Sequence, residues 1–257
     1  MSNIILYYVF LSFFITFIAA TFLNSINFMV KGIKNKNRSL ILASLGFLSI
    51  SLGFIGSFVL NLGSLYLEIC VLIGYILTVL FTNTTFYKDT KSKAKLVLVG
   101  VIILGLVQIP FFILNMRQLY YMRVALDVPY TLLVFNWLAF SSNRVYKRIK
   151  VENIQPWIKV RYRLIFIFSF ILSLNNIPEF FQPSGINWGD STNLVSLMVF
   201  GAMATIVIVF SIGFSLAWFM PIPLKKYFNR NYIAVDEESL SEEELTNLLK
   251  NQLSENE

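Results

Sequence analysis

Residues 119–144 read LYYMRVALDVPYTLLVFNWLAFSSNR, and the interpretation of the whole chain starts from this stretch. It is long and apolar enough to cross a bilayer, because about 20 such residues span the hydrocarbon core as a helix. It nevertheless carries Arg123, Asp127 and Pro129 well inside the apolar run. A charge at the bilayer centre costs roughly 2.5–3.5 kcal/mol on insertion scales, so each charged side chain there needs a partner or a wet cavity.

One interpretation makes this stretch a bent helix with a polar pocket. Arg123 and Asp127 are four residues apart, so a helix places them on one face, close enough to pair. Pro129 removes a backbone hydrogen bond inside the helix and is the predicted hinge. Asn136 and Trp137 follow about two turns further on. Together these side chains predict a ligand pocket that opens on the non-cytoplasmic side.

The other interpretation starts the helix later, near Val128. Arg123 and Asp127 would then form an ordinary solvated pair in a loop, and Pro129 would occupy the tolerated first turn. Sequence periodicity places helix ends only to within a few residues. Both interpretations therefore stay open at this point, with the solvated pair slightly favoured.

Composition indicates an all-α integral membrane protein. The chain has 257 residues, of which 56% are hydrophobic, and its mean hydropathy is +0.68. It contains no His, which removes the commonest metal ligand and the commonest general base. Its single cysteine, Cys70, permits neither an internal disulfide nor a cysteine zinc site. We therefore expect no metal, no cofactor and no enzymatic activity.

Seven apolar runs predict a seven-transmembrane-helix bundle over residues 1–220. The first run is too long for a cleaved signal peptide and is interpreted as an uncleaved membrane helix. Beyond the bundle we expect an interfacial amphipathic segment at 221–235 and an acidic cytoplasmic tail at 236–257. The predicted membrane helices cover residues 4–30, 39–60, 65–86, 96–114, 119–144, 164–177 and 193–220, and the turn at 158–162 lengthens the sixth.

The Lys and Arg residues give the predicted orientation. Four, four, seven and three of them follow the first, third, fifth and seventh helices, whereas the opposite links carry Arg117 and Arg123. The positive-inside rule then places the N-terminus outside and the C-terminus in the cytoplasm. The basic residues also explain the pI near 9.4 without nucleic acid, because they lie where anionic lipids attract them. A multi-pass protein of the plasma membrane is the expected location.

The most basic segment lies between the fifth and sixth helices. It is expected to contact lipid headgroups or a protein partner, together with the basic residues that follow the seventh helix. A leucine stripe in the acidic tail either docks on a protein partner or belongs to a disordered segment. The expected contacts are Arg144, Lys147, Arg148, Lys150, Lys159, Arg161, Arg163, Lys225 and Lys226.

Two further features concern packing and the outer links. Ser49, Gly53 and Ser57 recur every four residues in the second helix, which favours close helix contact in lipid. Glu68, near the start of the third helix, either faces the bundle or lies at the headgroup level, and the headgroup level is favoured. Residues 178–192 are rich in turn formers and aromatics, and fold over the bundle or lie at the interface.

Known seven-helix families are excluded by specific residues. A retinal protein needs a lysine in the seventh helix, and residues 193–220 contain none. Receptors that couple to G proteins carry an acid–Arg–aromatic triplet at the inner end of the third helix, which here reads NTTFYKD. Sugar transporters with repeated prolines and zinc hydrolases with histidine ligands are excluded as well. The topology is similar in shape alone to the membrane regions of prokaryotic sensory kinases, and no kinase domain follows.

The leading hypothesis is a seven-helix sensor or receptor-like module that binds a small or lipidic ligand from the outer side. The signal would pass through Pro129 to the basic cytoplasmic loops. A membrane transporter or ion-conducting protein is one alternative, and a structural subunit of a larger membrane complex is another. The predicted ligand-binding residues are Glu68, Arg123, Asp127, Asn136, Trp137 and Glu179.

Overall fold

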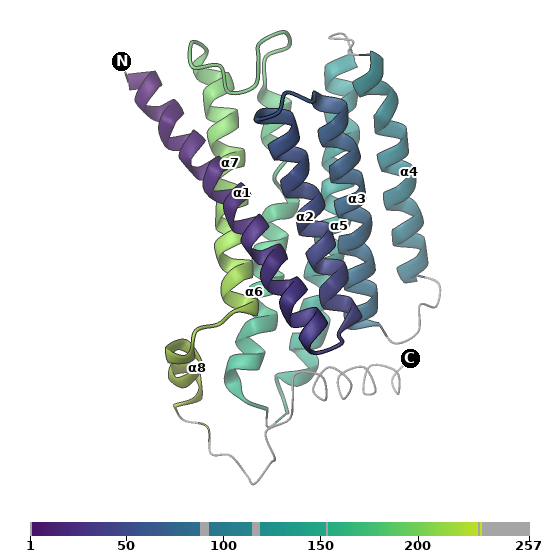
Figure 1. Ribbon diagram of the computed structural model, residues 1–257, viewed down its shortest axis with the longest axis vertical. Coiled ribbons are helices and arrows are strands. Elements are labelled where there is room, and N and C mark those ends of the chain that lie inside the picture. Colours follow the sequence, from purple (N-terminus) through teal and green to yellow (C-terminus); the bar gives the residue numbers. More distant parts are fainter. Residues whose placement is uncertain (1, 88–92, 115–118, 153, 231, 233–257) are drawn as a thin grey trace.

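The computed structural model describes residues 2–87, 93–114, 119–152, 154–230 and 232. Within these ranges the regular structure is helical throughout, and seven helices are long and apolar enough to cross a membrane (Figure 1). The predicted all-α, seven-helix architecture and the multi-pass membrane assignment are therefore confirmed. Residues 236–257 lie outside the described residues, and so does the interaction expected of the acidic tail.

The helices end within a few residues of the predicted positions, but several are longer. α1 and α5 extend beyond the apolar runs because each continues into a basic segment that can leave the bilayer. The elements are α1 (Ser2–Lys34), α2 (Arg38–Phe58), α3 (Ser64–Phe86), α4 (Lys93–Leu114), α5 (Tyr120–Ile149), α6 (Pro156–Ser173), η2 (Ile177–Phe181), α7 (Leu194–Trp218) and α8 (Ile222–Asn229).

Short polar residues fix where two of the helices begin. The Asn37 side chain accepts hydrogen bonds from the backbone N–H groups of Ser39 and Leu40 at the start of α2. Asn193 caps α7 in the same way, by accepting from the backbone N–H of Ser196 at 3.0 Å. α6 starts with Pro156, whose missing N–H has no role in the first turn. Such caps satisfy donors that would otherwise be left unpaired at the helix ends.

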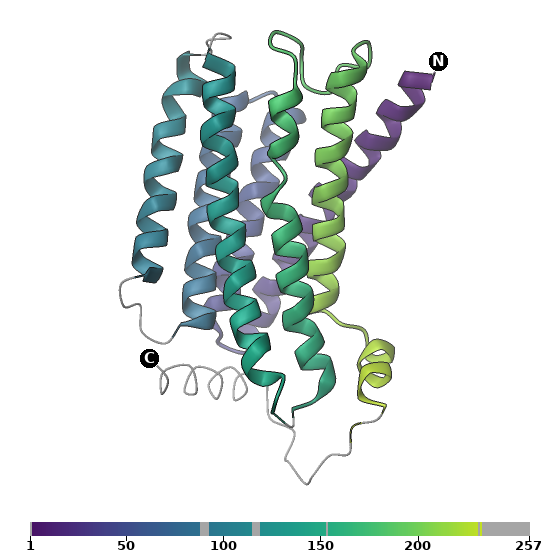
Figure 2. The same cartoon turned by 180° about the vertical axis from the view of Figure 1, so that it is seen from behind.

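Six helices form a closed ring, and α4 lies outside it. Around the ring α1 contacts α2, α2 contacts α3, α3 contacts α5, α5 contacts α6, α6 contacts α7, and α7 contacts α1 (Figures 1 and 2). α4 packs on both α3 and α5 and so covers the seam between them. The ring encloses the space in which the polar residues of the upper half meet.

Small residues hold α2 and α3 together, as the spacing in α2 predicted. A Cβ atom added at Gly53 would lie 2.7 Å from the Cβ of Cys70, and one at Gly46 would lie 3.3 Å from the carbonyl oxygen of Gly74. The Ser49 hydroxyl donates to the carbonyl of Cys70 at 2.8 Å. These contacts need glycine or serine, so this stripe is explained by packing.

The two ends of the bundle differ in charge. We call the end where α1 begins the upper end and the end where α1 stops the lower end, as they appear in Figure 1. Among the described Lys and Arg residues, all except Arg123 lie toward the lower end. The predicted amphipathic segment there contains the short helix α8, and Lys225 of α8 lies 4.2 Å from the ring centroid of Trp157 at the start of α6.

Candidate functional site

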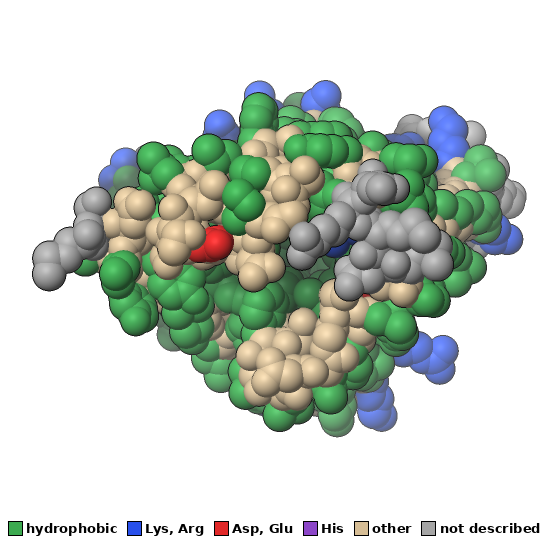
Figure 3. Space-filling view, turned by 90° about the horizontal axis from the view of Figure 1, so that it is seen from above, with side chains coloured by type: hydrophobic (Ala, Val, Ile, Leu, Met, Phe, Trp, Pro, Cys, Tyr) green, Lys and Arg blue, Asp and Glu red, His purple; other side chains and the backbone are tan. Residues whose placement is uncertain are grey.

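A cavity of about 340 Å³ opens in the upper half of the helix ring. Figure 3 looks down on the upper end and shows a depression walled largely by hydrophobic side chains. Most of the wall comes from α2, α3, α5, α7 and the segment after α6, with one residue each from α1 and α4. The aromatic lining residues are Phe14, Phe54, Phe58, Tyr75, Phe112, Tyr120 and Trp188.

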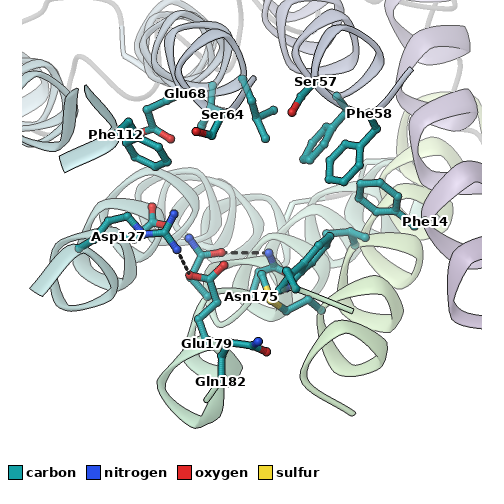
Figure 4. Close-up of a pocket in the computed structure, with 18 of the residues that line it drawn as sticks. Phe14, Ser57, Phe58, Ser64, Glu68, Phe112, Asp127, Asn175, Glu179 and Gln182 are labelled. Atoms are coloured by element: carbon teal, nitrogen blue, oxygen red, sulfur yellow. Dashed lines mark hydrogen bonds and ion pairs between the residues drawn. The ribbon is translucent and has the colours of Figure 1, made fainter. Parts of the chain in front are cut away.

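Three carboxyl groups reach this cavity from three separate elements. Glu68 comes from α3, Asp127 from α5 and Glu179 from η2 (Figure 4). Glu68 is only 6% exposed and lines the cavity, so the preference for a position at the headgroup level was wrong. Its place in the second turn of α3 brings this side chain to the cavity wall.

Arg123 is helical but does not have the predicted partner. α5 begins at Tyr120, so the interpretation with a helix start near Val128 and a solvated loop pair was wrong. The ion pair that Arg123 forms is with Glu179, at 3.6 Å, rather than with Asp127. Its guanidinium lies 5.1 Å from the ring centroids of both Phe112 and Tyr120. These rings and the acid on η2 draw the side chain away from the residue one turn further along α5.

Gln108 of α4 contacts Glu68 and Asp127, the two acids that do not pair with Arg123. The predicted site did not include Gln108. It is fully buried. In the amide orientation that satisfies both of its ends, Nε2 donates to Glu68 at 2.7 Å and Oε1 accepts from the backbone N–H of Asp127 at 3.1 Å. In the opposite orientation Nε2 lies 3.4 Å from the Asp127 carboxylate. In the sequence, the sign that Gln108 could belong to the site was its position as a single amide side chain in an otherwise apolar run.

Asn136 and Trp137 do not lie in this cavity, which corrects their place in the predicted site. The Trp137 indole donates to the Asn83 side chain at 2.8 Å and stacks on Tyr87. Asn136 accepts from the Ser173 hydroxyl at 3.2 Å. Both residues sit too far down α5 to reach the acids, because each residue advances a helix by about 1.5 Å. α5 continues as one helix through Pro129, whose role as a hinge stays a prediction.

The segment after α6, for which folding over the bundle or lying at the interface was predicted, packs on α7 at the upper end. Gln182 is 2% exposed, and its Nε2 donates to the Ser196 hydroxyl and to the carbonyl of Ile186. Trp188 packs against Phe200 of α7 with the ring centroids 4.6 Å apart. These contacts hold the segment on α7, so that Gln182 and Trp188 become part of the cavity wall.

Several polar atoms of the cavity wall have no hydrogen bond within the described part of the chain. Three of them are acceptors, on Asn175, Glu179 and Gln182, and Glu179 retains its ion pair with Arg123. Two are donors, namely Nε of Arg123 and Nε1 of the Trp188 indole. Buried polar groups are normally satisfied, so these atoms leave the wall incompletely paired, although each atom is itself closed off from the cavity space.

Below this site the interior narrows and then closes. A second cavity of about 70 Å³ shares wall residues with the first, among them Tyr75 and Asn175. Beneath it, packed aromatic rings fill the centre of the bundle. They are Phe28, Phe47, Phe210, Phe214 and Trp218. The larger cavity therefore opens at the upper end (Figure 3), and among the described residues these rings lie between it and the lower end.

The basic residues expected to contact headgroups all lie toward the lower end, but one of them is buried. Lys147, Lys150 and Arg163 are exposed there. Arg161 is 5% exposed and donates from Nε to the carbonyl of Ala217 at 3.1 Å. Arg161 thus caps the end of α7 from inside the bundle, and it is too buried for the predicted contact with headgroups or a protein partner. The remaining members of the predicted set are Arg144, Arg148, Lys159, Lys225 and Lys226, which are partly or fully exposed.

Comparison with models of known protein families, with curated proteins and with solved structures finds no match for this chain.

Proposed function

We propose that the protein is a seven-helix, receptor-like membrane sensor that binds a small ligand in the upper cavity. The observation that carries this proposal is the cavity of about 340 Å³, which is lined by both aromatic and ionisable side chains. Binding pockets are typically concave and mostly apolar, with a few convergent polar groups that fix orientation. The cavity combines an aromatic wall with three acids and one arginine, which fits that description.

The charge distribution supports access from outside the cell. Described Lys and Arg residues other than Arg123 lie toward the lower end, and positive charge near membrane spans favours the cytoplasmic side. The upper end and the N-terminus would then face outward. A ligand would enter from the medium or from the outer leaflet.

α5 offers a direct connection between the cavity and the lower end. Arg123 and Asp127 lie in its first turns, and Lys147 lies in its last turn. Its 30 residues make a rod of about 45 Å. A ligand that shifts the upper part of α5 would move the basic residues that follow it, which is how we expect the signal to reach the cytoplasmic side.

A transporter is the second candidate, because the smaller cavity continues from the larger one toward the middle of the bundle. The aromatic rings below it favour binding over passage. A transporter would need a second conformation in which the rings of Phe47 and Phe214, now 5.3 Å apart between centroids, separate. Uptake of a bound probe into proteoliposomes would distinguish the two candidates.

Cysteine labelling tests the outward-facing cavity. On a Cys70→Ala background, Ser64→Cys places a thiol on the cavity wall at the upper end, and Lys147→Cys places one at the exposed lower end. In intact cells, a membrane-impermeant maleimide should label Ser64→Cys, and should label Lys147→Cys only after permeabilisation. The reverse pattern would overturn the proposed orientation and, with it, ligand entry from outside.

A further inference from the structure

We infer that the ligand of the upper cavity is an organic cation, a primary ammonium group on a compact apolar body. This inference names the ligand class for the proposed function and rests on it. Its starting point is the balance of charge around the cavity, where three carboxyl groups face one guanidinium. A buried carboxyl ionises readily only when a cation lies beside it, so a ligand that brings positive charge is the partner these acids lack.

The one cation of the wall is already engaged. Arg123 pairs with Glu179 at 3.6 Å and lies against the rings of Phe112 and Tyr120. In the orientation that satisfies both of its ends, the neutral amide of Gln108 joins the Glu68 carboxyl to the backbone N–H of Asp127. Within the described residues, neither of these two acids forms an ion pair of its own. An ammonium group placed beside them would supply the missing charge.

Gln182 provides an independent indication that the ligand donates hydrogen bonds. It is 2% exposed, and the contacts with Ser196 and Ile186 fix its amide so that Nε2 is the satisfied end. Its Oε1 lacks a partner among the described residues, as does the Oδ1 of Asn175, and because both atoms are closed off from the cavity space, a ligand would reach them only when the side chains of the wall shift. An ammonium group carries three donors and no acceptor, which suits two amide oxygens and a carboxylate.

The geometry favours an organic cation over a metal ion. No group of three or more acidic, Cys or His side chains converges closely enough to hold a metal, in the part of the chain that the structure describes. The acids are instead spread along one side of the cavity, while Phe14 and Phe58 lie on the opposite side (Figure 4). Aromatic faces attract cations and pack against apolar groups. The unpaired indole N–H of Trp188 could also donate to an oxygen on the ligand body.

Three isosteric probes test the ligand class on the unmodified full-length protein. They are 4-phenylbutylammonium, 4-phenylbutanol and 4-phenylbutyrate, which share one body and differ in charge. Affinity is measured by isothermal titration in phosphatidylcholine nanodiscs. We expect the amine to bind at least about tenfold more tightly than the alcohol, and the carboxylate to bind least well. Equal or tighter binding of the alcohol or the carboxylate would overturn the inference.

Single variants then locate the bound amine. Glu68→Gln and Asp127→Asn should each weaken amine binding roughly tenfold or more and leave alcohol binding within about twofold. Glu152→Gln removes an acid at the lower end and serves as the matched control, with no change expected. If both cavity variants bind the amine like the unmodified protein, the ammonium does not lie beside these acids and the inference fails. The probe comparison keeps the inference testable if a variant does not fold.

Phosphatidylethanolamine carries the same ammonium chemistry as a free amine. Replacing phosphatidylcholine by this lipid should weaken the apparent affinity for 4-phenylbutylammonium if the lipid is the natural source, and leave it unchanged if the source is a free amine.

Maleimide labelling of Ser64→Cys distinguishes a wrong ligand class from a wrong proposed function. If the alcohol or the carboxylate protects Ser64→Cys from maleimide and the amine does not, the inference of a cationic ligand is wrong, but the proposal that the cavity binds a ligand still holds. A Ser64→Cys thiol that is never labelled from outside would overturn both.

Discussion

Two polar clusters lie along α5, one in each half of the bundle, and they differ in how completely their groups are paired. In the lower cluster, the Asn83 amide donates to the carbonyl of Ala94 at 3.0 Å and accepts from the Trp137 indole at 2.8 Å. Tyr87 shares a hydrogen bond with Ser141 and stacks on Trp137. In the upper cluster, acceptor atoms on the cavity wall have no donors among the described residues.

The difference separates a structural polar cluster from one that can receive a ligand. A buried network whose members are all satisfied rigidifies the helices it joins, and it offers nothing to a ligand. A network with unpaired groups around an open space carries a cost that a ligand or water can remove. We therefore expect changes in the lower cluster to alter stability, and changes in the upper cluster to alter binding.

The largest expected effect comes from removing both acids that lack an ion pair. The double variant Glu68→Gln, Asp127→Asn should weaken binding of 4-phenylbutylammonium by roughly 100-fold or more, since each charge-assisted contact contributes about 1.5–3 kcal/mol. Titration calorimetry in nanodiscs measures the change. A double variant that binds no more weakly than either single variant would show that the acids do not act on the ligand together.

The next effect concerns the link between α5 and the segment that covers the cavity. Glu179→Gln removes the partner of Arg123, and we expect the free energy of unfolding to fall by roughly 1–3 kcal/mol. This is less than for a fully buried pair, because the Arg123 and Glu179 side chains are 24% and 13% exposed. Asp127→Asn, which leaves this pair intact, should lower the thermal midpoint less. Equal losses in the two variants would contradict the assignment of Glu179 as the partner.

A smaller effect is expected in the lower cluster. Asn83→Leu leaves the Trp137 indole and the Ala94 carbonyl without their partners and should cost about 1–2 kcal/mol of stability. Amine affinity should stay within about twofold of the unmodified protein, because the cavity is untouched. Thermal unfolding and titration of the same preparation give both values. A large loss of affinity with unchanged stability would reverse the roles of the two clusters.

The smallest effect is a local dependence on pH in the turn that follows Trp188. Hydrogen bonds from the Thr192 backbone N–H and hydroxyl, at 2.8 and 2.7 Å, hold the pKa of the Asp190 carboxyl below its ordinary value. A lowered folded-state pKa means that this turn is fully stabilised above the ordinary carboxyl range and loses the contribution as pH falls through the lowered pKa. Fluorine NMR of fluorotryptophan at Trp188 should show the transition, and Asp190→Asn should abolish it. A transition that persists in Asp190→Asn would assign it to another group.

The number of helices and the segregation of charge followed from the sequence. Hydrophobic runs and flanking Lys and Arg residues are local properties, and they are strong because lipid leaves the backbone few alternatives to a helix. The stripe of Ser49 and Gly53 predicted close packing for the same reason. These features required no knowledge of which helices are neighbours.

The residues that form the site could be predicted from the sequence only in part. Glu68, Arg123, Asp127 and Glu179 were predicted and do meet at one cavity. Their pairing could not be predicted, because the choice of Glu179 over Asp127 depends on how the segment after α6 folds back. The contribution of Gln108 depends on α4 covering the seam between two helices.

Asn136 and Trp137 were grouped with the acids because they share a helix with Arg123 and Asp127. Spacing along one helix gives the face on which a residue lies but not the partner that another helix presents to it. Here α3 presents Asn83 to Trp137, and α6 presents Ser173 to Asn136. These contacts join residues 54 and 37 positions apart in the chain, so sequence spacing carries no sign of them.

A crystal structure with 4-(4-bromophenyl)butylammonium tests the central claim most directly, because anomalous scattering locates the bromine. We expect the ammonium within hydrogen-bonding distance of Glu68 or Asp127 and of the Gln182 amide oxygen, and the bromophenyl ring against Phe14 and Phe58. Bromine signal at the lower end or on the lipid-facing surface, with the upper cavity empty, would contradict the claim that this cavity is the binding site.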